Sequence, residues 1–228
     1  FPDAVQHRFE ERLNRETRRV ERVETVRFRD LLLETREAGP PDPFRAAEVL
    51  ARCIHEAGWP LKQWNAAAEN WILRVNVLAA HCPELEISGI GEADRLFLIE
   101  QICEGATAYK EVKDRPVLPV LHSWIPEALH PLVEDWTPER FQLPGGSRPR
   151  LRYEPDGSVV LPARIQQLYD VPGDSLAICR GRCPLKLEIL APNGRPVQVT
   201  DDLDGFWKGQ YPAIRKELFG RYPKHEWR

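Results

Sequence analysis

The sequence predicts an α+β fold with an N-terminal β-ribbon, a helical middle and a compact C-terminal αβ unit with antiparallel strands. Three observations predict it. Apolar and charged residues approach alternation near the N-terminus, helical periodicity follows a proline-rich break, and short strand-and-turn patterns return in the last third. The expected domains are a ribbon over 1–38, a helical domain over 39–140 and an αβ domain over 141–228.

The ribbon is expected from His7 to Leu33. Valine and phenylalanine alternate there with arginine and glutamate, most clearly in the second half, which is typical of exposed strands. Two or three strands are expected, as the tail of a small barrel whose other strands are absent. A charged helix is the alternative, because Glu and Arg are both good helix formers.

The helical middle begins after the Gly39–Pro43 break. Asp42 is placed to cap a helix that opens with Pro43 and stops at Gly58. Further helices are expected over 61–80, from Ser88 or Gly91 onward, and over 117–129. The prolines between Leu129 and Pro144 predict a tight connection.

The C-terminal third is predicted to form strands and turns, followed by helices. Strands are expected over 148–154, 159–160, 185–190 and 195–200, and a short helix from Pro162 to Tyr169. Asn193-Gly194 is the strongest hairpin signal, since both residues tolerate positive φ. Thr200 or Asp202 caps the next helix, and the last one runs from Pro212 to Gly220.

Composition excludes several classes of protein. No apolar run approaches the roughly 20 residues of a membrane span, so no membrane association is expected. The first residues have no basic start or apolar stretch, which predicts no secretory signal, and the absence of methionine suggests a piece of a longer chain. Five cysteines at irregular spacings favour a reducing, cytoplasmic setting over a disulfide framework.

Catalytic and metal-binding motifs are not found. The sequence has no Gly-rich loop with the Lys and Ser/Thr that hold phosphate and magnesium, and no Gly-x-Ser-x-Gly elbow. Cys179 and Cys183 make at most half of a zinc site, because the nearest other candidates, His81-Cys82, are expected to lie far off in the helical part. Buried cysteines are therefore expected, with no metal, and an independent hydrolase is a remote alternative.

Charge is distributed unevenly. Residues 38–140 carry nine basic and sixteen acidic side chains, a net charge of −7, whereas 141–228 carry fourteen and ten, a net charge of +4. A positive C-terminal third predicts that this end of the chain faces a polyanion.

Residues 192–227 carry a recognisable signature. They match at Pro192, Arg195-Pro196, Gln198, Thr200, Asp202-Leu203, Phe206-Trp207, Tyr211, Lys216-Glu217, Gly220 through His225, and Trp227. This pattern closely resembles the C-terminal ending of HrpB-type ATP-dependent helicases, bacterial members of the DEAH-box group. Leu143-Pro144, Gly146 and Tyr153 resemble an upstream segment of that family, whereas Gly145 and Tyr169-Asp170 depart from its usual pattern.

The resemblance implies a longer parent with two RecA-like motor domains, winged-helix and helical-bundle domains and a small barrel. ATP and Mg²⁺ would bind in the motor, so the resemblance implies no cofactor and no ATP hydrolysis in this chain, although the parent would be an ATP hydrolase. The expected partners are RNA or single-stranded nucleic acid and the motor domains of the same polypeptide.

Two basic clusters are candidates for nucleic-acid contact. Arg148, Arg150 and Arg152 alternate on one predicted strand, so they would project from one face toward phosphates. Arg221, Lys224 and His225 surround Tyr222, whose ring could stack on a base, and Lys208, Arg215 and Lys216 extend the charge.

The alternative for the aromatic residues is packing. Phe206, Trp207, Tyr211 and Tyr222 would then form the core of the C-terminal unit, with arginines lying over apolar surface. The module would in that case brace the motor or dock another protein without touching nucleic acid.

Overall fold

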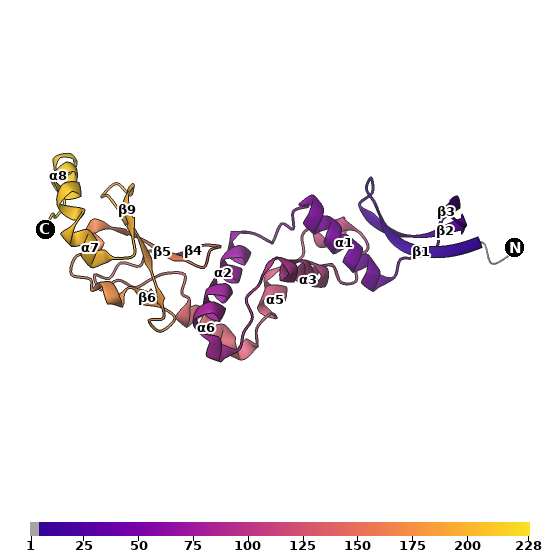
Figure 1. The fold of residues 1–228 in the computed structure, drawn as a ribbon, viewed down its shortest axis with the longest axis horizontal. Coiled ribbons are helices and arrows are strands. Elements are labelled where there is room, and N and C mark those ends of the chain that lie inside the picture. Colours follow the sequence, from indigo (N-terminus) through magenta and orange to yellow (C-terminus); the bar gives the residue numbers. More distant parts are fainter. Residues whose placement is uncertain (1–4) are drawn as a thin grey trace. The chain divides into compact units, whose positions relative to one another are not determined.

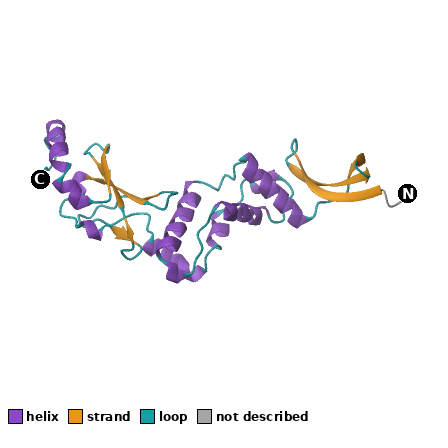
Figure 2. Cartoon of the chain, in the orientation of Figure 1, coloured by secondary structure: helices purple, strands orange, loops and turns teal. Residues whose placement is uncertain are grey.

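The computed structural model describes residues 5–228 and confirms the α+β class (Figures 1 and 2). The chain folds as two compact units. Unit 1 comprises the described residues up to Glu69 together with Ile90–Trp124, and unit 2 comprises Asn70–Gly89 together with Ile125–Arg228. The three-domain division expected from composition stays a prediction.

The N-terminal ribbon is an open antiparallel meander. Strands β1 (Val5–Asn14), β2 (Arg19–Phe28) and β3 (Leu31–Glu37) pair in that order, which confirms the strands over the charged helix. Val20 is buried, whereas β3 is exposed along its whole length. Within unit 1, the β1–β2 end of the ribbon is tied to the helices because the Val20 amide donates to the Thr107 carbonyl at 2.7 Å.

Helix α1 (Pro43–Ala57) has the expected ends. The Asp42 carboxylate accepts hydrogen bonds from the amides of Phe44 and Arg45, and Gly58 closes the helix with a φ of 63°. The face that packs on α3 (Glu92–Cys103) is fully buried. That face comprises Ala46, Ala47, Leu50, Ala51 and Ile54.

Removing the Asp42 cap is expected to destabilise unit 1 by about 1 kcal/mol. The reason is that the first amides of a helix have no carbonyl partner within the helix, and the Asp42 carboxylate accepts their hydrogen bonds instead. Urea denaturation of Asp42→Ala followed by circular dichroism measures the effect. Asp42→Asn keeps the cap and should stay close to wild type. Equal losses in both variants would show that the carboxylate acts through its charge instead.

The other helices differ from expectation in two places. Helix α2 (Ala66–His81) begins later than residue 61 because the Asn65 side chain caps it, accepting from the amides of Ala67 and Ala68. The single helix expected over 117–129 is wrong. Helix α4 (Tyr109–Val112) is followed by α5 (Leu118–His122), a 3-10 turn at Glu127–Leu129, and α6 (His130–Trp136).

Pro126 accounts for the break after α5. It adopts an extended backbone, with φ −54° and ψ 138°, and a proline has no N–H to continue a helix. The predicted connection over 129–144 is therefore wrong in its first half, where α6 forms instead.

The C-terminal sheet has the order β4-β5-β8-β9. Its strands are β4 (Arg152–Tyr153), β5 (Val159–Arg164), β8 (Lys186–Leu190) and β9 (Pro196–Thr200), and β6 (Ala177–Ile178) pairs separately with β7 (Cys183–Pro184). The expected antiparallel pairing holds for β4–β5 and β8–β9, whereas β5 and β8 are parallel. The Asn193-Gly194 turn is confirmed, with a φ of 83° at Gly194.

Two proline positions correct the strand predictions. The strand expected over 148–154 is reduced to β4, because Pro149 has no N–H and the preceding residues form an irregular hairpin with 139–143. Pro162 lies inside β5 rather than at a helix start. Since β4 pairs only with Val159 and Val160, no strand on that side needs an N–H from Pro162, and only a 3-10 turn (Ile165–Gln167) follows.

Helices α7 (Leu203–Lys208) and α8 (Tyr211–Arg221) end the fold. Asp202 caps α7 as expected by accepting from the Gly205 amide at 2.8 Å, and α8 continues one residue past Gly220. Among the described residues, no helix is long and apolar enough to cross a membrane.

Candidate nucleic-acid interface

The first basic cluster projects outward but is largely neutralised. Leu151 and Tyr153 point inward, so Arg148, Arg150 and Arg152 are exposed as the alternation predicts, although only Arg152 lies in a strand. Arg152 binds Glu154 at 2.5 Å and Glu188 at 3.1 Å, and Arg150 lies 3.6 Å from Glu139. The hydrogen bonds that Arg152 donates to Glu188 and Glu154 raise the pKa of Arg152.

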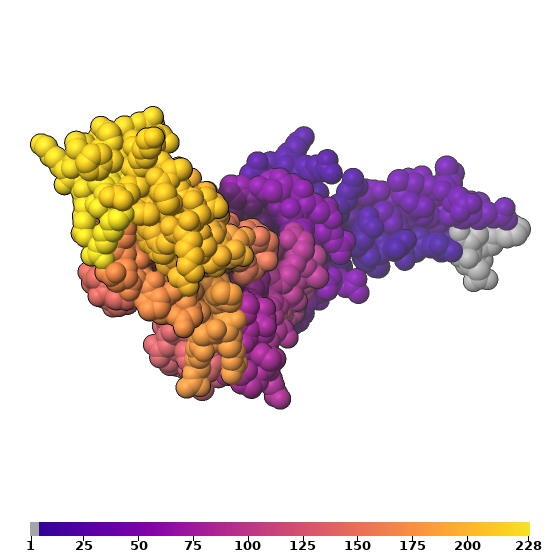
Figure 3. All heavy atoms as spheres, turned by 60° about the vertical axis from the view of Figure 1, so that its left-hand side comes forward, coloured from indigo at the N-terminus to yellow at the C-terminus, as the bar shows by residue number. Residues whose placement is uncertain are grey.

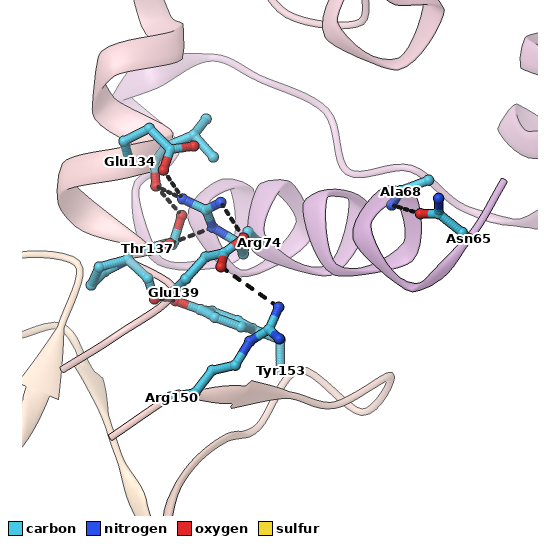
Figure 4. A network of polar contacts seen from close by, with 10 residues as sticks. Asn65, Ala68, Arg74, Glu134, Thr137, Glu139, Arg150 and Tyr153 are labelled. Atoms are coloured by element: carbon cyan, nitrogen blue, oxygen red, sulfur yellow. Dashed lines mark hydrogen bonds and ion pairs between the residues drawn. The ribbon is translucent and has the colours of Figure 1, made fainter. Parts of the chain in front are cut away.

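A buried arginine lies near this cluster, with Glu139 between it and Arg150 (Figure 4). Arg74 on α2 is 3% exposed and donates to the carbonyls of Thr137 and Val133, while Glu134 pairs with it at 2.8 Å. Glu139 lies between Arg74 and Arg150, and the Tyr153 hydroxyl donates to the Pro138 carbonyl at 2.7 Å. Arg74 therefore fixes residues 133–139, and this segment is hydrogen-bonded to the one that carries the first cluster, since the Leu151 amide donates to the Glu139 carbonyl.

The second basic cluster borders a pocket of about 320 Å³ between α8 and the β8–β9 hairpin. Arg221 and Tyr222 line it together with Arg195, which the sequence analysis placed in the family signature but not among the candidate contact residues. The signal for Arg195 was its place directly after the Asn193-Gly194 turn, which turns it toward α8. Glu217, four residues before Arg221, pairs with it at 3.2 Å.

Arg195 and several cations of the second basic cluster have no ion-pair partner within the described part of the chain. They are exposed, and the last helix and tail lie at the surface in the space-filling view (Figure 3, yellow). This set comprises Arg195, Lys208, Arg215, Lys216 and Lys224. His225 is also exposed, and its ring lies 6.0 Å from that of Tyr222.

Three of the four aromatic residues left open by the sequence pack together. Phe206 and Tyr211 are buried, and Trp207 contacts both, with ring centroids at 5.0 and 4.8 Å. Tyr169 joins them through a 2.8 Å hydrogen bond between its hydroxyl and that of Tyr211. Tyr222 is the exception, because it is half-buried and lines the pocket.

The C-terminal end is anchored by residues that depart from the family pattern. Asp170 pairs with Arg228, whose guanidinium also lies 4.9 Å from the Tyr169 ring centroid. The Tyr169 hydroxyl donates to the Glu226 carbonyl at 3.2 Å. The tail carrying Lys224 and His225 is thereby held beside α8.

The cysteines behave as buried residues. Cys82, Cys179 and Cys183 are each at most 3% exposed, and burial together with the neighbouring thiols raises the pKa of Cys179 to about 12. The view that residue 82 lies far from the 179–183 turn is thus wrong, since α2 ends beside it and Arg182 pairs with Glu84. Even so, the described residues offer no cluster of three or more His, Cys, Asp or Glu that could hold a metal ion.

Comparison with known proteins agrees with the C-terminal signature. The family model described as "ATP-dependent helicase C-terminal" (HrpB_C) matches residues 98–228, more than half of the chain. A curated relative, the ATP-dependent RNA helicase HrpB of Escherichia coli K12, is 29% identical over 201 residues, which cover 86% of this chain and 25% of the relative. The chain thus spans about a quarter of that protein.

Two solved structures share the fold. The crystal structure of the E. coli DExH-box NTPase HrpB matches with a TM-score of 0.73 and 26% identity, covering 100% of this chain and 28% of the other. A second, of the E. coli DEAH/RHA helicase HrpB, matches with a TM-score of 0.63 and 26% identity, covering 98% and 29%. The protein therefore belongs to the C-terminal family of HrpB-type ATP-dependent helicases.

Proposed function

We propose that this chain is the accessory C-terminal part of an ATP-dependent helicase and contacts single-stranded nucleic acid, RNA in particular, beside the motor. The pocket bordered by Arg195, Arg221 and Tyr222 carries the proposal. Arg195, which has no ion-pair partner among the described residues, and Arg221 line it beside the half-buried Tyr222 ring, and cations beside an aromatic ring are the combination that binds phosphates and one stacked base.

The named relatives support this reading. The E. coli relative is called an RNA helicase and one of the solved structures an NTPase. ATP and Mg²⁺ would bind in the motor domains, which are the second expected partner, and this chain would contribute no ATP hydrolysis. Five free cysteines fit the reducing cytoplasm in which such a protein would work.

A brace or protein-docking module is the second candidate. Phe219 on α8 and Val199 on β9 are each 53% exposed, and such side chains offer apolar contact rather than charge. The guanidinium groups of Arg150 and Arg152 form ion pairs with carboxylates of the same unit, which leaves them less available for phosphates. Salt separates the two candidates, because phosphate binding weakens steeply with ionic strength and apolar docking does not.

The test is fluorescence anisotropy of a labelled single-stranded RNA at low and moderate salt. Arg195→Glu/Arg221→Glu is expected to weaken binding about tenfold at low salt and to reduce the slope of log K against log salt by about 0.7 per lost phosphate contact. Arg148→Glu/Arg150→Glu/Arg152→Glu tests the first cluster in parallel.

The matched control is Arg45→Glu/Lys110→Glu, which makes the same change of charge on exposed positions of unit 1. It should bind RNA as wild type does. No binding by the wild-type protein at low salt, or binding insensitive to salt, would contradict the proposal and leave the docking module.

A further inference from the structure

Unit 1 contains a pocket that the proposed interface does not use. It has a volume of about 430 Å³, which lies within the usual range for small-ligand sites. The end of α1, the loop 58–64 and the start of α3 form its walls. Two indoles, Trp59 and Trp64, line it, and both are half-buried, so part of each ring faces the pocket or solvent.

Both indoles are held in place. The Trp64 Nε1 donates to Glu69 at 2.6 Å, and Glu69 in turn receives two hydrogen bonds from Arg95 at 2.7 and 2.8 Å. Trp59 packs against Tyr109, with ring centroids 5.1 Å apart, and the Tyr109 hydroxyl donates to the Pro60 carbonyl. Fixed rings lose little rotational freedom when a flat ligand stacks on them.

Arg18 lies beside the same aromatic group. Its guanidinium is 4.8 Å from the Trp59 ring centroid and 5.4 Å from that of Tyr109. Within the described residues no carboxylate pairs with it, although two carboxylates, Glu69 and Glu92, lie near the other polar groups of the pocket. An arginine that stacks on aromatic rings and has no ion pair keeps its hydrogen-bond donors for a ligand.

The backbone at Arg18 adopts an uncommon conformation. Its φ is 52°, in the left-handed region that non-glycine residues rarely adopt. The Arg18 carbonyl accepts from the Tyr109 amide at 3.0 Å, and the Val20 amide donates to Thr107, so the ribbon turn is pinned against 107–109. Strain held by surrounding contacts is characteristic of functional positions.

The polar rim is of mixed charge. His55 lies 3.4 Å from Glu92, and Arg95 lies 3.9 Å from Glu92 while its main partner is Glu69. Lys62 is paired with Asp114 at 2.7 Å. Arg18 is therefore the cation of this group that remains available for a phosphate.

We propose that this pocket binds a base of single-stranded nucleic acid, which stacks on Trp59 or Trp64 while Arg18 contacts the adjacent phosphate. The proposal rests on the proposed function only for the class of ligand, since every residue involved lies in unit 1. Aromatic side chains accept any base on their faces, so binding is expected to depend little on sequence.

Ultraviolet cross-linking of the protein to single-stranded RNA, followed by mass spectrometry, locates the contact without altering the fold. The expected result is a cross-link on a peptide that contains Trp59 or Trp64, retained in Arg195→Glu/Arg221→Glu. Cross-links confined to unit 2, or none, would overturn the proposal. If Arg195→Glu/Arg221→Glu loses its cross-links in unit 2 but keeps those at Trp59 or Trp64, the result supports both the interface in unit 2 and the pocket in unit 1.

Two substitutions give the affinity readout. Arg18→Met keeps an apolar side chain over Trp59. It is expected to reduce the slope of log K against log salt by about 0.7, the amount for one phosphate contact on a single strand. Trp64→Ala should weaken binding about tenfold with the salt dependence unchanged, and Trp64→Phe, which keeps a stacking ring, should recover most of it. Affinities within twofold of wild type in Arg18→Met and Trp64→Ala, at unchanged thermal stability, would contradict the proposal. A peptide that occupies the pocket without changing the affinity of the protein for RNA would also contradict the proposal.

Discussion

Arg74→Ala is expected to lower the free energy of unfolding of unit 2 by about 3 kcal/mol, because each hydrogen bond from a buried charged donor contributes about 1.5–3 kcal/mol. The guanidinium donates to the Thr137 carbonyl at 2.5 Å and to the Val133 carbonyl at 3.0 Å. Thr137 is fully buried, so its carbonyl would lose its partner without gaining water.

Urea denaturation followed by circular dichroism measures the loss, and two variants separate its causes. Arg74→Met fills most of the volume without donors, whereas Arg74→Lys keeps the charge without the planar fork. Arg215→Ala, at an exposed position of α8, is the control and should stay within about 0.5 kcal/mol of wild type. A fully stable Arg74→Met would show that the hydrogen bonds merely offset the cost of burying the charge.

Glu69→Gln is expected to destabilise unit 1 by about 2 kcal/mol at neutral pH. The Glu69 carboxylate accepts from Trp64 and, through both oxygens, from Arg95. An amide can accept at one position only and presents donors to Arg95 at the other. The carboxylate is partly exposed, which keeps the expected effect below that of a fully buried ion pair.

The effect of Glu69→Gln should depend on pH. The hydrogen bonds from Arg95 lower the pKa of Glu69 below its usual 4.5, burial opposes this, and the Trp64 bond adds to it. A lowered folded-state pKa means that the carboxylate stabilises fully above its unfolded pKa and loses that contribution as pH falls through the folded value.

The difference between wild type and Glu69→Gln should therefore be constant near neutrality and shrink below about pH 4.5. Denaturation curves at a series of pH values measure it. Glu48→Gln, at an exposed position of α1, should show no such dependence. If the difference in free energy of unfolding stays the same below pH 4.5, the shape of the Glu69 side chain rather than its charge is responsible.

Local signals in the sequence were sufficient for several helix ends and for the hairpin turn. Asp42, Gly58, Asp202 and the Asn193-Gly194 turn act within a few residues of themselves, and all were predicted correctly. The break at Pro126 was missed because the apolar spacing over 117–129 is helical, and one proline outweighs it.

Long-range pairing was beyond the sequence. The parallel contact of β5 with β8 places Pro162 in a strand, and no local pattern predicts it. The partner of Arg152 is Glu188, thirty-six residues away, so alternation could show that this arginine faces outward but not that it is neutralised. The same holds for Arg195, which joins Arg221 and Tyr222 only through the fold.

The β5–β8 pairing also sets the order in which the chain can assemble. The ribbon β1–β2–β3 joins strands that are consecutive in the sequence, and such contacts close short loops at small entropic cost. Strands β5 and β8 are neighbours only after the chain from Ile165 to Leu185 has closed as a loop, with β6 and β7 inside it. We therefore expect the C-terminal sheet to form more slowly than the ribbon. Until it forms, Glu188 is not beside Arg152, whereas Arg221 and Glu217 pair within one helix, so the two basic clusters acquire their native charge pattern at different stages.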